Sequence, residues 1–309
     1  MKNNNPKGII LILIGMFIVS FMDATFKYIN TSVNLYEAYF VRTLISFGVI
    51  ASYLKITNKP IIFTTHYPLL TSVRVILFFF GFSSFYISLT IMPLATATAL
   101  FFASPFLITI FAIFFLKEEV GIRRWSAVII GFIGVYIILN PDFNDFDYLS
   151  LTPVLCAFCY ALSMIIIKKT SDKDDVYSQM FHFYIFAIII SLIIYFFMGD
   201  GQYNNFGHPA SQFIFRKWFN NLEFSLPYMI FIGVIGATGF LCFFTAYRIA
   251  SPAVVSPFEY SILAWASLNG WIFFDEIPNQ RTIVGMILIV CGSIYIFILS
   301  LIHISEPTR

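Results

Sequence analysis

The chain has 309 residues, of which 59% are hydrophobic, 19% aromatic and only 11% charged. A soluble domain carries about 25% charged residues, and a mean hydropathy of +0.86 is more apolar than one core can absorb, so an ordinary soluble enzyme is excluded. The net charge is +2 with basic residues spread along the chain, which excludes a nucleic-acid footprint. The composition predicts an all-α integral membrane protein.

Ten apolar runs are long enough to cross a bilayer as a helix, which takes about 20 residues. They cover 8–28, 36–54, 68–90, 94–116, 124–140, 150–167, 178–198, 226–247, 252–274 and 281–300. We expect the protein in the cytoplasmic (inner) membrane. Basic residues concentrate in the N-terminal segment and in alternating loops, so we expect both termini on the cytoplasmic side. The loop 199–225 contains Phe213, Phe215, Trp218 and Phe219, which predicts a short amphipathic helix at the outer interface.

The first helix contains Asp23 and Lys27, which are four residues apart and share a helix face. Ionisable groups inside lipid are costly, so they face a cavity or a partner. Asp23 either lies in a central cavity, where it binds a cationic group or carries a proton, or it forms a self-neutralising pair with Lys27. The sequence leaves both interpretations open.

The second helix contains Glu37 and Arg42, five residues apart and poorly placed to pair with each other. Arg42 lies deep in the span and needs an acidic partner from another helix, for which Asp23 and Glu259 are the candidates. Its planar fork of donors suits a carboxylate or phosphate, and the alternative is a buried clamp that fixes helix packing. Arg74 begins the third helix, where we expect a cytoplasmic anchor, with a position facing the cavity entrance as the alternative.

Prolines interrupt two later helices in corresponding places. Pro105 follows the small, hydroxyl-rich run 95–104 in the fourth helix, and the ninth contains Pro252 and Pro257. Interrupted helices in two halves of a transporter indicate a binding site. Glu259, beside Tyr260, is therefore a candidate for charge recognition or proton coupling, with an ion pair to Arg42 as its alternative.

Aromatic residues near these positions are candidates for stacking on a planar substrate, with simple packing as the alternative for each. They are Phe85, Tyr86, Trp265 and Trp271. The glycines Gly233, Gly236 and Gly239 recur every third residue, which favours close helix packing over any nucleotide loop.

The two halves of the chain repeat each other at an offset of 158 residues. The segment Phe115 to Glu118 aligns with Phe273 to Glu276, Arg123 with Arg281, and Gly134 with Gly292. Five helices per copy is an odd number, so the second copy is inserted upside down. Inverted repeats are typical of secondary transporters. We therefore expect two inverted five-helix repeats, residues 1–148 and 149–298.

These motifs resemble the EamA-type transporters of the drug/metabolite transporter superfamily, over nearly the whole chain. Within it, the chain is similar to the branch of S-adenosylmethionine and riboflavin uptake carriers. The matching pieces are Asp23 with Lys27, Glu37 with Arg42, the Arg74 segment, LTIMPLATATAL at 89–100 and SPFEYS at 256–261. Two positions, Val75 and Glu259, depart from the pattern of that branch.

The sequence therefore predicts a carrier, not an enzyme, that moves a small organic metabolite by alternating access. S-adenosylmethionine-like, riboflavin-like and amino-acid-like substrates remain open, as do uptake driven by protons, exchange, and oligomeric state. No phosphate-binding loop for ATP occurs, and neither a metal nor another cofactor is expected. One alternative is an exporter of amino acids or drugs on the same fold. The other is a membrane-embedded transferase, which needs a polar catalytic cluster; the nearest thing to one is Asp142, Asp145 and Asp147, in an outer loop.

The last eleven residues, 299–309, read like a translated transposase sequencing adapter. We expect this tail to be foreign to the native protein, in which case Glu306 and Arg309 have no functional meaning. Resequencing the locus through codon 299 tests this hypothesis.

Overall fold

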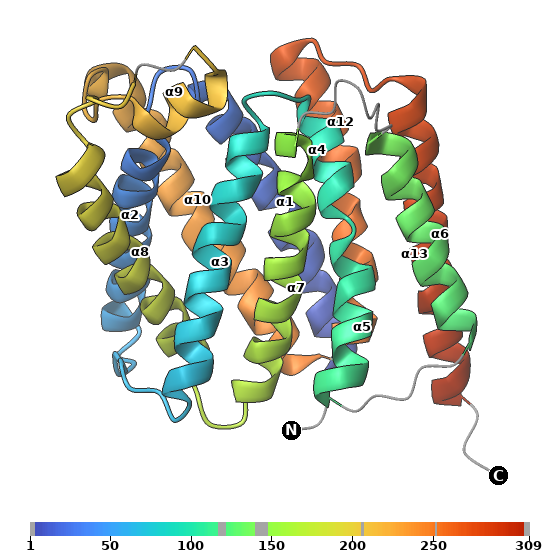
Figure 1. The fold of residues 1–309 in the computed structure, drawn as a ribbon. Helices are drawn as coiled ribbons and strands as arrows, with labels where there is room; N and C mark the ends of the chain where they lie inside the picture. The colour runs from blue at the N-terminus through green and yellow to red at the C-terminus, as the bar shows by residue number, and fades with distance from the viewer. Residues whose placement is uncertain (1–3, 117–121, 140–147, 205–206, 251, 306–309) are drawn as a thin grey trace.

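The computed structural model describes residues 4–116, 122–139, 148–204, 207–250 and 252–305 (Figure 1). Within these ranges every regular element is helical. The acidic loop with Asp142, Asp145 and Asp147, the turn 117–121 and residues 306–309 lie outside the described residues.

The helices follow the apolar runs of the sequence closely. The first half contains α1 (Asn5–Ile29), α2 (Leu35–Ile56), α3 (Pro68–Ser88), α4 (Leu94–Phe101), α5 (Ser104–Leu116) and α6 (Ile122–Leu139). The second half contains the 3₁₀ turn η1 (Tyr148–Leu151), α7 (Thr152–Thr170), α8 (Val176–Met198), α9 (Pro209–Phe215), α10 (Leu222–Ile249), α11 (Pro252–Val255), the 3₁₀ stretch η2 (Ser256–Tyr260), α12 (Ser261–Phe274) and α13 (Gln280–Ser305).

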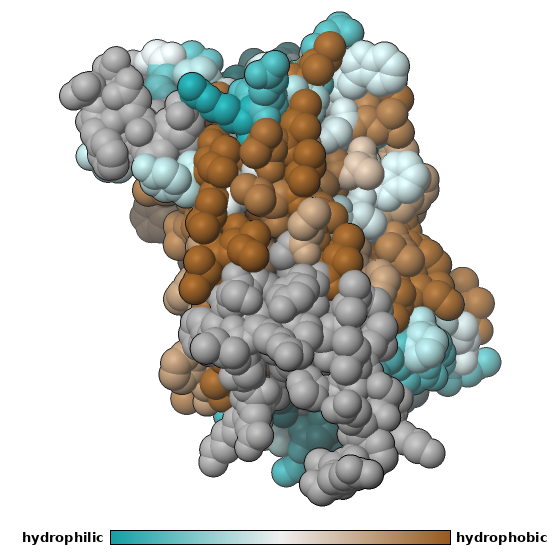
Figure 2. Space-filling model, turned by 90° about the vertical axis from the view of Figure 1, so that its right-hand side faces the viewer, coloured by the Kyte–Doolittle hydropathy of each residue, from teal (hydrophilic) through white to brown (hydrophobic). Residues whose placement is uncertain are grey.

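In the described ranges, seven helical segments are long and apolar enough to cross a membrane. They are Asn5–Ile29, Leu35–Ile56, Pro68–Ser88, Leu94–Phe115, Tyr148–Thr170, Val176–Met198 and Leu222–Ile249. Large apolar side chains such as Leu69, Phe114 and Phe196 are exposed on the outside of the bundle. Figure 2 shows hydrophobic side chains over the middle of one face and hydrophilic ones toward its ends. Such a surface suits lipid better than water.

The predicted interruptions are confirmed. The α4 helix ends at Phe101, and α5 begins at Ser104, directly before Pro105. In the second half, η2 separates α11 from α12 and contains Pro257 and Glu259. Proline lacks an N–H and clashes with the preceding turn, so the regular helix cannot run through these positions.

The helices pack in pairs. The largest contacts join α1 to α10, α3 to α7 and α6 to α13; further contacts join α2 to α8 and α10, α3 to α8, α5 to α7, and α1 to α12. The glycine run on α10 explains one close approach, because a Cβ on Gly233 would lie 2.6 Å from the Ile45 Cβ atom and 2.9 Å from the Arg42 carbonyl oxygen. The packing interpretation of these glycines is confirmed.

The start of α1 and the end of α13 lie at one end of the bundle, and α9 lies at the other (Figure 1). The α9 helix falls in the loop predicted to be helical. Asn34 fastens that loop to the bundle, because its Nδ2 atom donates to the Ile214 and Arg216 carbonyl oxygens at 2.6 and 2.8 Å. Phe213 and Trp218 are buried there.

Candidate functional site

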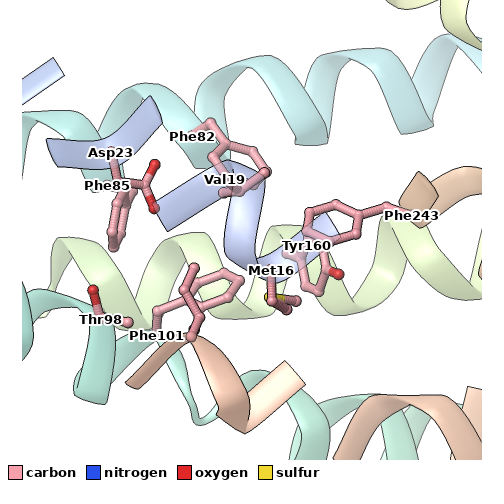
Figure 3. Close-up of a pocket in the computed structure, with 10 residues that line it drawn as sticks. Met16, Val19, Asp23, Phe82, Phe85, Thr98, Phe101, Tyr160 and Phe243 are labelled. Carbon is pink, nitrogen blue, oxygen red and sulfur yellow. The ribbon is translucent and has the colours of Figure 1, made fainter. Parts of the chain in front are cut away.

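A narrow cavity lies in the middle of the bundle, among α1, α3, α4, α7, α10 and α12 (Figure 3). Its walls consist of Met16, Val19, Asp23, Phe82, Phe85, Thr98, Phe101, Tyr160, Phe243 and Ile262. The space open to water-sized molecules is about 20 Å³, whereas sites that hold organic ligands measure about 300–1,000 Å³. In this conformation the cavity is too small for a metabolite.

A larger hollow of about 540 Å³ lies on the flank of the bundle, between α1, α10 and α12. Its lining residues include Phe21, Tyr28, Phe231 and Phe274 but neither a carboxylate nor a basic group. The central cavity has Asp23 in its wall and is the better candidate for recognition of a polar substrate.

Asp23 lies on α1 and is buried. Its Oδ1 atom accepts a hydrogen bond of 3.4 Å from the Tyr86 hydroxyl. Lys27 does not neutralise it, because the Lys27 ammonium is 2.6 Å from the Glu276 carboxylate and donates to the Met92 carbonyl oxygen at 2.9 Å. The interpretation of Asp23 and Lys27 as a pair is wrong, since Lys27 lies one turn closer to the end of α1 and finds its partners there.

Arg42 is 2% exposed, and aromatic rings surround its guanidinium. The ring centroids of Tyr39, Phe26, Phe240 and Tyr86 lie 4.3, 5.3, 5.7 and 5.9 Å from its Cζ atom. Among the described residues, no carboxylate approaches this guanidinium within 4.0 Å. The predicted ion pair between Arg42 and either Asp23 or Glu259 is therefore wrong for this conformation.

Glu259 is fully buried in η2 and is held by two tyrosines. Its Oε1 atom accepts hydrogen bonds from the Tyr160 hydroxyl at 2.7 Å and from the Tyr247 hydroxyl, whereas its Oε2 atom contacts no donor in the described part of the chain. Tyr160 also lines the central cavity, so one side chain connects this carboxylate to the cavity wall. Neighbouring Tyr260 packs its ring 4.7 Å from Phe102.

Three other candidates lie away from the cavity. Glu37 is at the start of α2, where its Oε2 atom accepts a hydrogen bond of 3.1 Å from the Phe219 backbone N–H. Trp265 packs 4.9 Å from the Phe17 ring, and Trp271 is 58% exposed on the outside of α12. The structure therefore brings together Asp23, Tyr86 and Arg42, with Glu259 behind Tyr160.

Arg74 is not the surface anchor that the sequence predicted. It is 1% exposed, its Nη2 atom donates to the Gln179 carbonyl oxygen at 2.8 Å, and its Cζ atom lies 5.5 Å from the Phe244 ring centroid. The prediction was wrong because α8 and α10 cover the start of α3, and the sequence of α3 alone does not indicate that cover.

The tyrosines Tyr160 and Tyr247 were missed by sequence reasoning. The chain contains 17 tyrosines, and nothing in the spacing of these two indicates that α7 and α10 bring them to one carboxylate. The usable signal was indirect: a buried carboxylate in an apolar span needs donors from neighbouring helices.

Polar contacts join the helix ends at both ends of the bundle. At the end near α9, Glu276 binds Lys27 and accepts a 3.0 Å hydrogen bond from the Leu94 backbone N–H at the start of α4. At the other end, Arg248 donates to the Asp174 and Ser171 carbonyl oxygens, and Lys168 donates to the Ala250 carbonyl oxygen at 2.9 Å. Helix termini are therefore tied together at both ends of the bundle.

Asp174, in the loop between α7 and α8, is the centre of the second set of contacts. Its carboxylate accepts hydrogen bonds from the Thr65 hydroxyl and, at 2.9 Å, from the His66 backbone N–H. Burial works to raise the pKa of this carboxyl, but these hydrogen bonds outweigh it and hold the pKa below its ordinary value.

Comparison with known proteins places this architecture among transporters. A family model described as the EamA-like transporter family matches residues 6–140 and 149–298. A relative in Rickettsia prowazekii named S-adenosylmethionine uptake transporter is 28% identical over 94% of this chain and 92% of its own length. A riboflavin transporter of Vibrio cholerae is 30% identical over 66% of this chain and 63% of its own length.

A third relative works in the opposite direction by its name. The pseudopaline exporter CntI of Pseudomonas aeruginosa is 23% identical over 93% of this chain and 94% of its own length. A solved crystal structure also shares the fold, with a TM-score of 0.65 at 15% identity, and the match covers 96% of this chain and 99% of that chain.

Proposed function

We propose that this chain, which belongs to the EamA-like transporter family, is a carrier and not an enzyme. It moves a small organic metabolite across the cytoplasmic membrane by alternating access. In this proposal ten transmembrane helices form two inverted five-helix repeats, 1–148 and 149–298. Both termini lie in the cytoplasm.

The packing of the helices supports the repeat. In the proposed repeat each helix of the first half has a counterpart in the second. The counterparts of α1, α2, α3, α4–α5 and α6 are, in order, α7, α8, α10, α11–α12 and α13. Exchanging counterparts converts the α1–α10 contact into the α7–α3 contact. The same exchange converts α2–α10 into α8–α3 and α1–α12 into α7–α5, and all of these contacts occur. A two-fold relation between halves is the arrangement that lets one half rock against the other.

The small central cavity is the observation that carries the proposal. It lies between the two halves and has a carboxylate in its wall, and helix ends are tied together at both ends of the bundle. A metabolite fits only if the helices move apart, and movement at one end at a time is alternating access. A channel needs a continuous path instead, with a pore-lining ring or filter.

The substrate class follows from the relatives and from the buried charges. S-adenosylmethionine is the first candidate, because the relative of that name matches nearly the whole chain; riboflavin-like and amino-acid-like compounds are the next. Asp23 in the cavity wall, and Glu259 behind Tyr160, are the proposed groups for recognition of a cationic group or for proton coupling. Export is the alternative direction, which the pseudopaline exporter relative favours.

Uptake into proteoliposomes tests the proposal. Labelled S-adenosylmethionine, riboflavin and a panel of amino acids are supplied outside, with and without a pH gradient. We expect saturable uptake of S-adenosylmethionine, and acceleration by an inward proton gradient if protons drive it. Movement of these compounds only out of preloaded vesicles would favour the exporter, and no movement in either direction would contradict the proposal.

A further inference from the structure

Arg42 is a buried cation whose donors are not used. Its Nη1 atom lies 3.5 Å from the Met22 Sδ atom, which is a weak acceptor, and its Nε and Nη2 atoms have no partner in the described part of the chain. Uncompensated charges are rare inside membrane proteins, because they are stable there only with an opposite charge or a polar cavity nearby.

Arg74, the second buried arginine in the described part of the chain, has a directed acceptor that Arg42 lacks, although its Nη1 atom also has no partner there. Arg74 donates from Nη2 to the Gln179 carbonyl oxygen at 2.8 Å, so a fixed backbone acceptor holds it in place. At Arg42, the surrounding rings stabilise the cation through their faces but accept no directed hydrogen bond. The two unused donors of Arg42 are adjacent on one edge of the guanidinium, which is the arrangement that binds both oxygens of one carboxylate.

One layer of aromatic rings separates Arg42 from the central cavity. Phe82 lines the cavity, and its ring lies 6.3 Å from the Tyr86 ring and 6.1 Å from the Phe240 ring. Tyr86 and Phe240 are themselves walls of the Arg42 site. For the guanidinium to reach the cavity, side chains in this layer must rotate when the helices move apart.

Asp23 lies on the cavity side of the same layer, because it lines the cavity and accepts the hydrogen bond from Tyr86. A carboxylate and a guanidinium thus flank Tyr86 without touching each other. This separation leaves each charge available for the opposite charge of a bound molecule.

We propose that Arg42 is the anion subsite of the transport cavity, and that the substrate is a zwitterion whose carboxylate binds Arg42 while its cationic group lies near Asp23. This inference rests on the proposed function for the identity of the cavity. It selects among the candidate substrates: S-adenosylmethionine and amino acids have the required carboxylate, whereas riboflavin has no anionic group.

Decarboxylated S-adenosylmethionine tests the subsite without any mutation, because it differs from S-adenosylmethionine only by the missing carboxylate. The purified wild-type protein binds labelled S-adenosylmethionine, and the analogue competes. We expect the analogue to bind at least about tenfold more weakly, since a site built for a polar group discriminates strongly against its loss. Equal affinities of the two compounds would overturn the proposal.

Variants then assign the discrimination to Arg42. Arg42→Gln should weaken S-adenosylmethionine binding to the level of the analogue and leave the affinity for the analogue unchanged. Arg74→Gln is the matched control, because it removes an equally buried arginine, and discrimination should persist there. If Arg42→Gln does not fold, Arg42→Lys retains the charge without the fork and should give intermediate discrimination. Discrimination that survives a folded Arg42→Gln protein would overturn the proposal.

The two proposals fail in different ways. Saturable transport of riboflavin, or of another compound with no anionic group, in preference to zwitterions would overturn the anion subsite and leave the transporter intact. Absence of transport for every compound in the panel would contradict the proposed function itself.

Discussion

Individual side chains in the bundle interior differ in what they bind, although they look alike in the sequence. Lys27 pairs with Glu276, Arg74 donates from one nitrogen to the Gln179 carbonyl oxygen, and Glu37 fastens a loop. In the described part of the chain, Glu259 retains one unused oxygen and Arg74 one unused nitrogen, whereas Arg42 retains two unused nitrogens. The sequence predicted that charged groups in the spans matter, but their partners lie on helices that only the packing brings close.

Glu259→Gln is the sharpest test of the carboxylate. The glutamine carbonyl oxygen can still accept from Tyr160 and Tyr247, so the fold and its thermal stability should stay near wild type. Transport should fall by about tenfold or more, because a neutral amide neither binds a cation strongly nor exchanges a proton. Uptake and thermal melting of the same preparation measure both effects. Normal uptake by this variant would remove Glu259 from the transport mechanism.

The loop carboxylate Asp174 predicts a pH dependence of stability. The pKa of Asp174 is lower in the folded than in the unfolded protein. Its carboxylate therefore stabilises the fold at pH values above its pKa in the unfolded protein, which is about 4. This contribution disappears as the pH falls through its lower pKa in the folded protein. Asp174→Asn should reduce the free energy of unfolding at pH 7 by about 1–3 kcal/mol. The difference between wild type and variant should shrink below about pH 4. A difference in melting temperature that stays constant over this range would contradict the assignment.

At the scale of the elements, the sequence predicted the helix ranges well because an apolar run bounded by polar residues allows little else in lipid. The interruptions at 102–103 and 256–260 were predictable from proline. The burial of Arg74 and the joint donation by Tyr160 and Tyr247 were not, since they depend on how α3, α7 and α10 are rotated against each other. A single sequence contains no direct record of those rotations.

The ion pair between Lys27 and Glu276 joins α1 to the end of α12 and the start of α4. Glu276→Gln retains an acceptor for the Leu94 N–H but removes the charge, so the closed arrangement at this end should weaken. A Thr98→Cys reporter in the cavity wall, in a background without native cysteines, should then react about fivefold faster with a water-soluble maleimide, as loss of on the order of 1 kcal/mol predicts. An unchanged labelling rate would show that this ion pair does not control access.

The α10 glycine run predicts a packing defect. Gly233→Ala places a methyl group 2.6 Å from the Ile45 Cβ atom, so α10 must move away from α2, at a cost of about 1–3 kcal/mol. Gly48→Ala on α2 is the matched control, because nothing lies within 4 Å of its Cβ position. The control should be neutral or more stable by up to about 1 kcal/mol, since alanine favours helix. Equal melting temperatures for the two variants would contradict the packing argument.

At the scale of the whole molecule, the composition and the aligned halves predicted a membrane carrier before any contact was known. The exchange of helix contacts between the halves and the small cavity between them support the proposed reorientation. The sequence could not indicate how small this cavity is, because its size depends on how residues far apart in the chain, such as Asp23 and Phe243, pack around it.

Counterflow in proteoliposomes tests alternating access most directly. Vesicles are loaded with unlabelled S-adenosylmethionine and diluted into a trace of labelled compound, without any gradient of protons. A carrier with one reorienting cavity returns to the outside mainly with unlabelled substrate, so the label should accumulate transiently above its equilibrium level and then decline. A steady approach to equilibrium at a rate independent of the internal substrate would contradict the account.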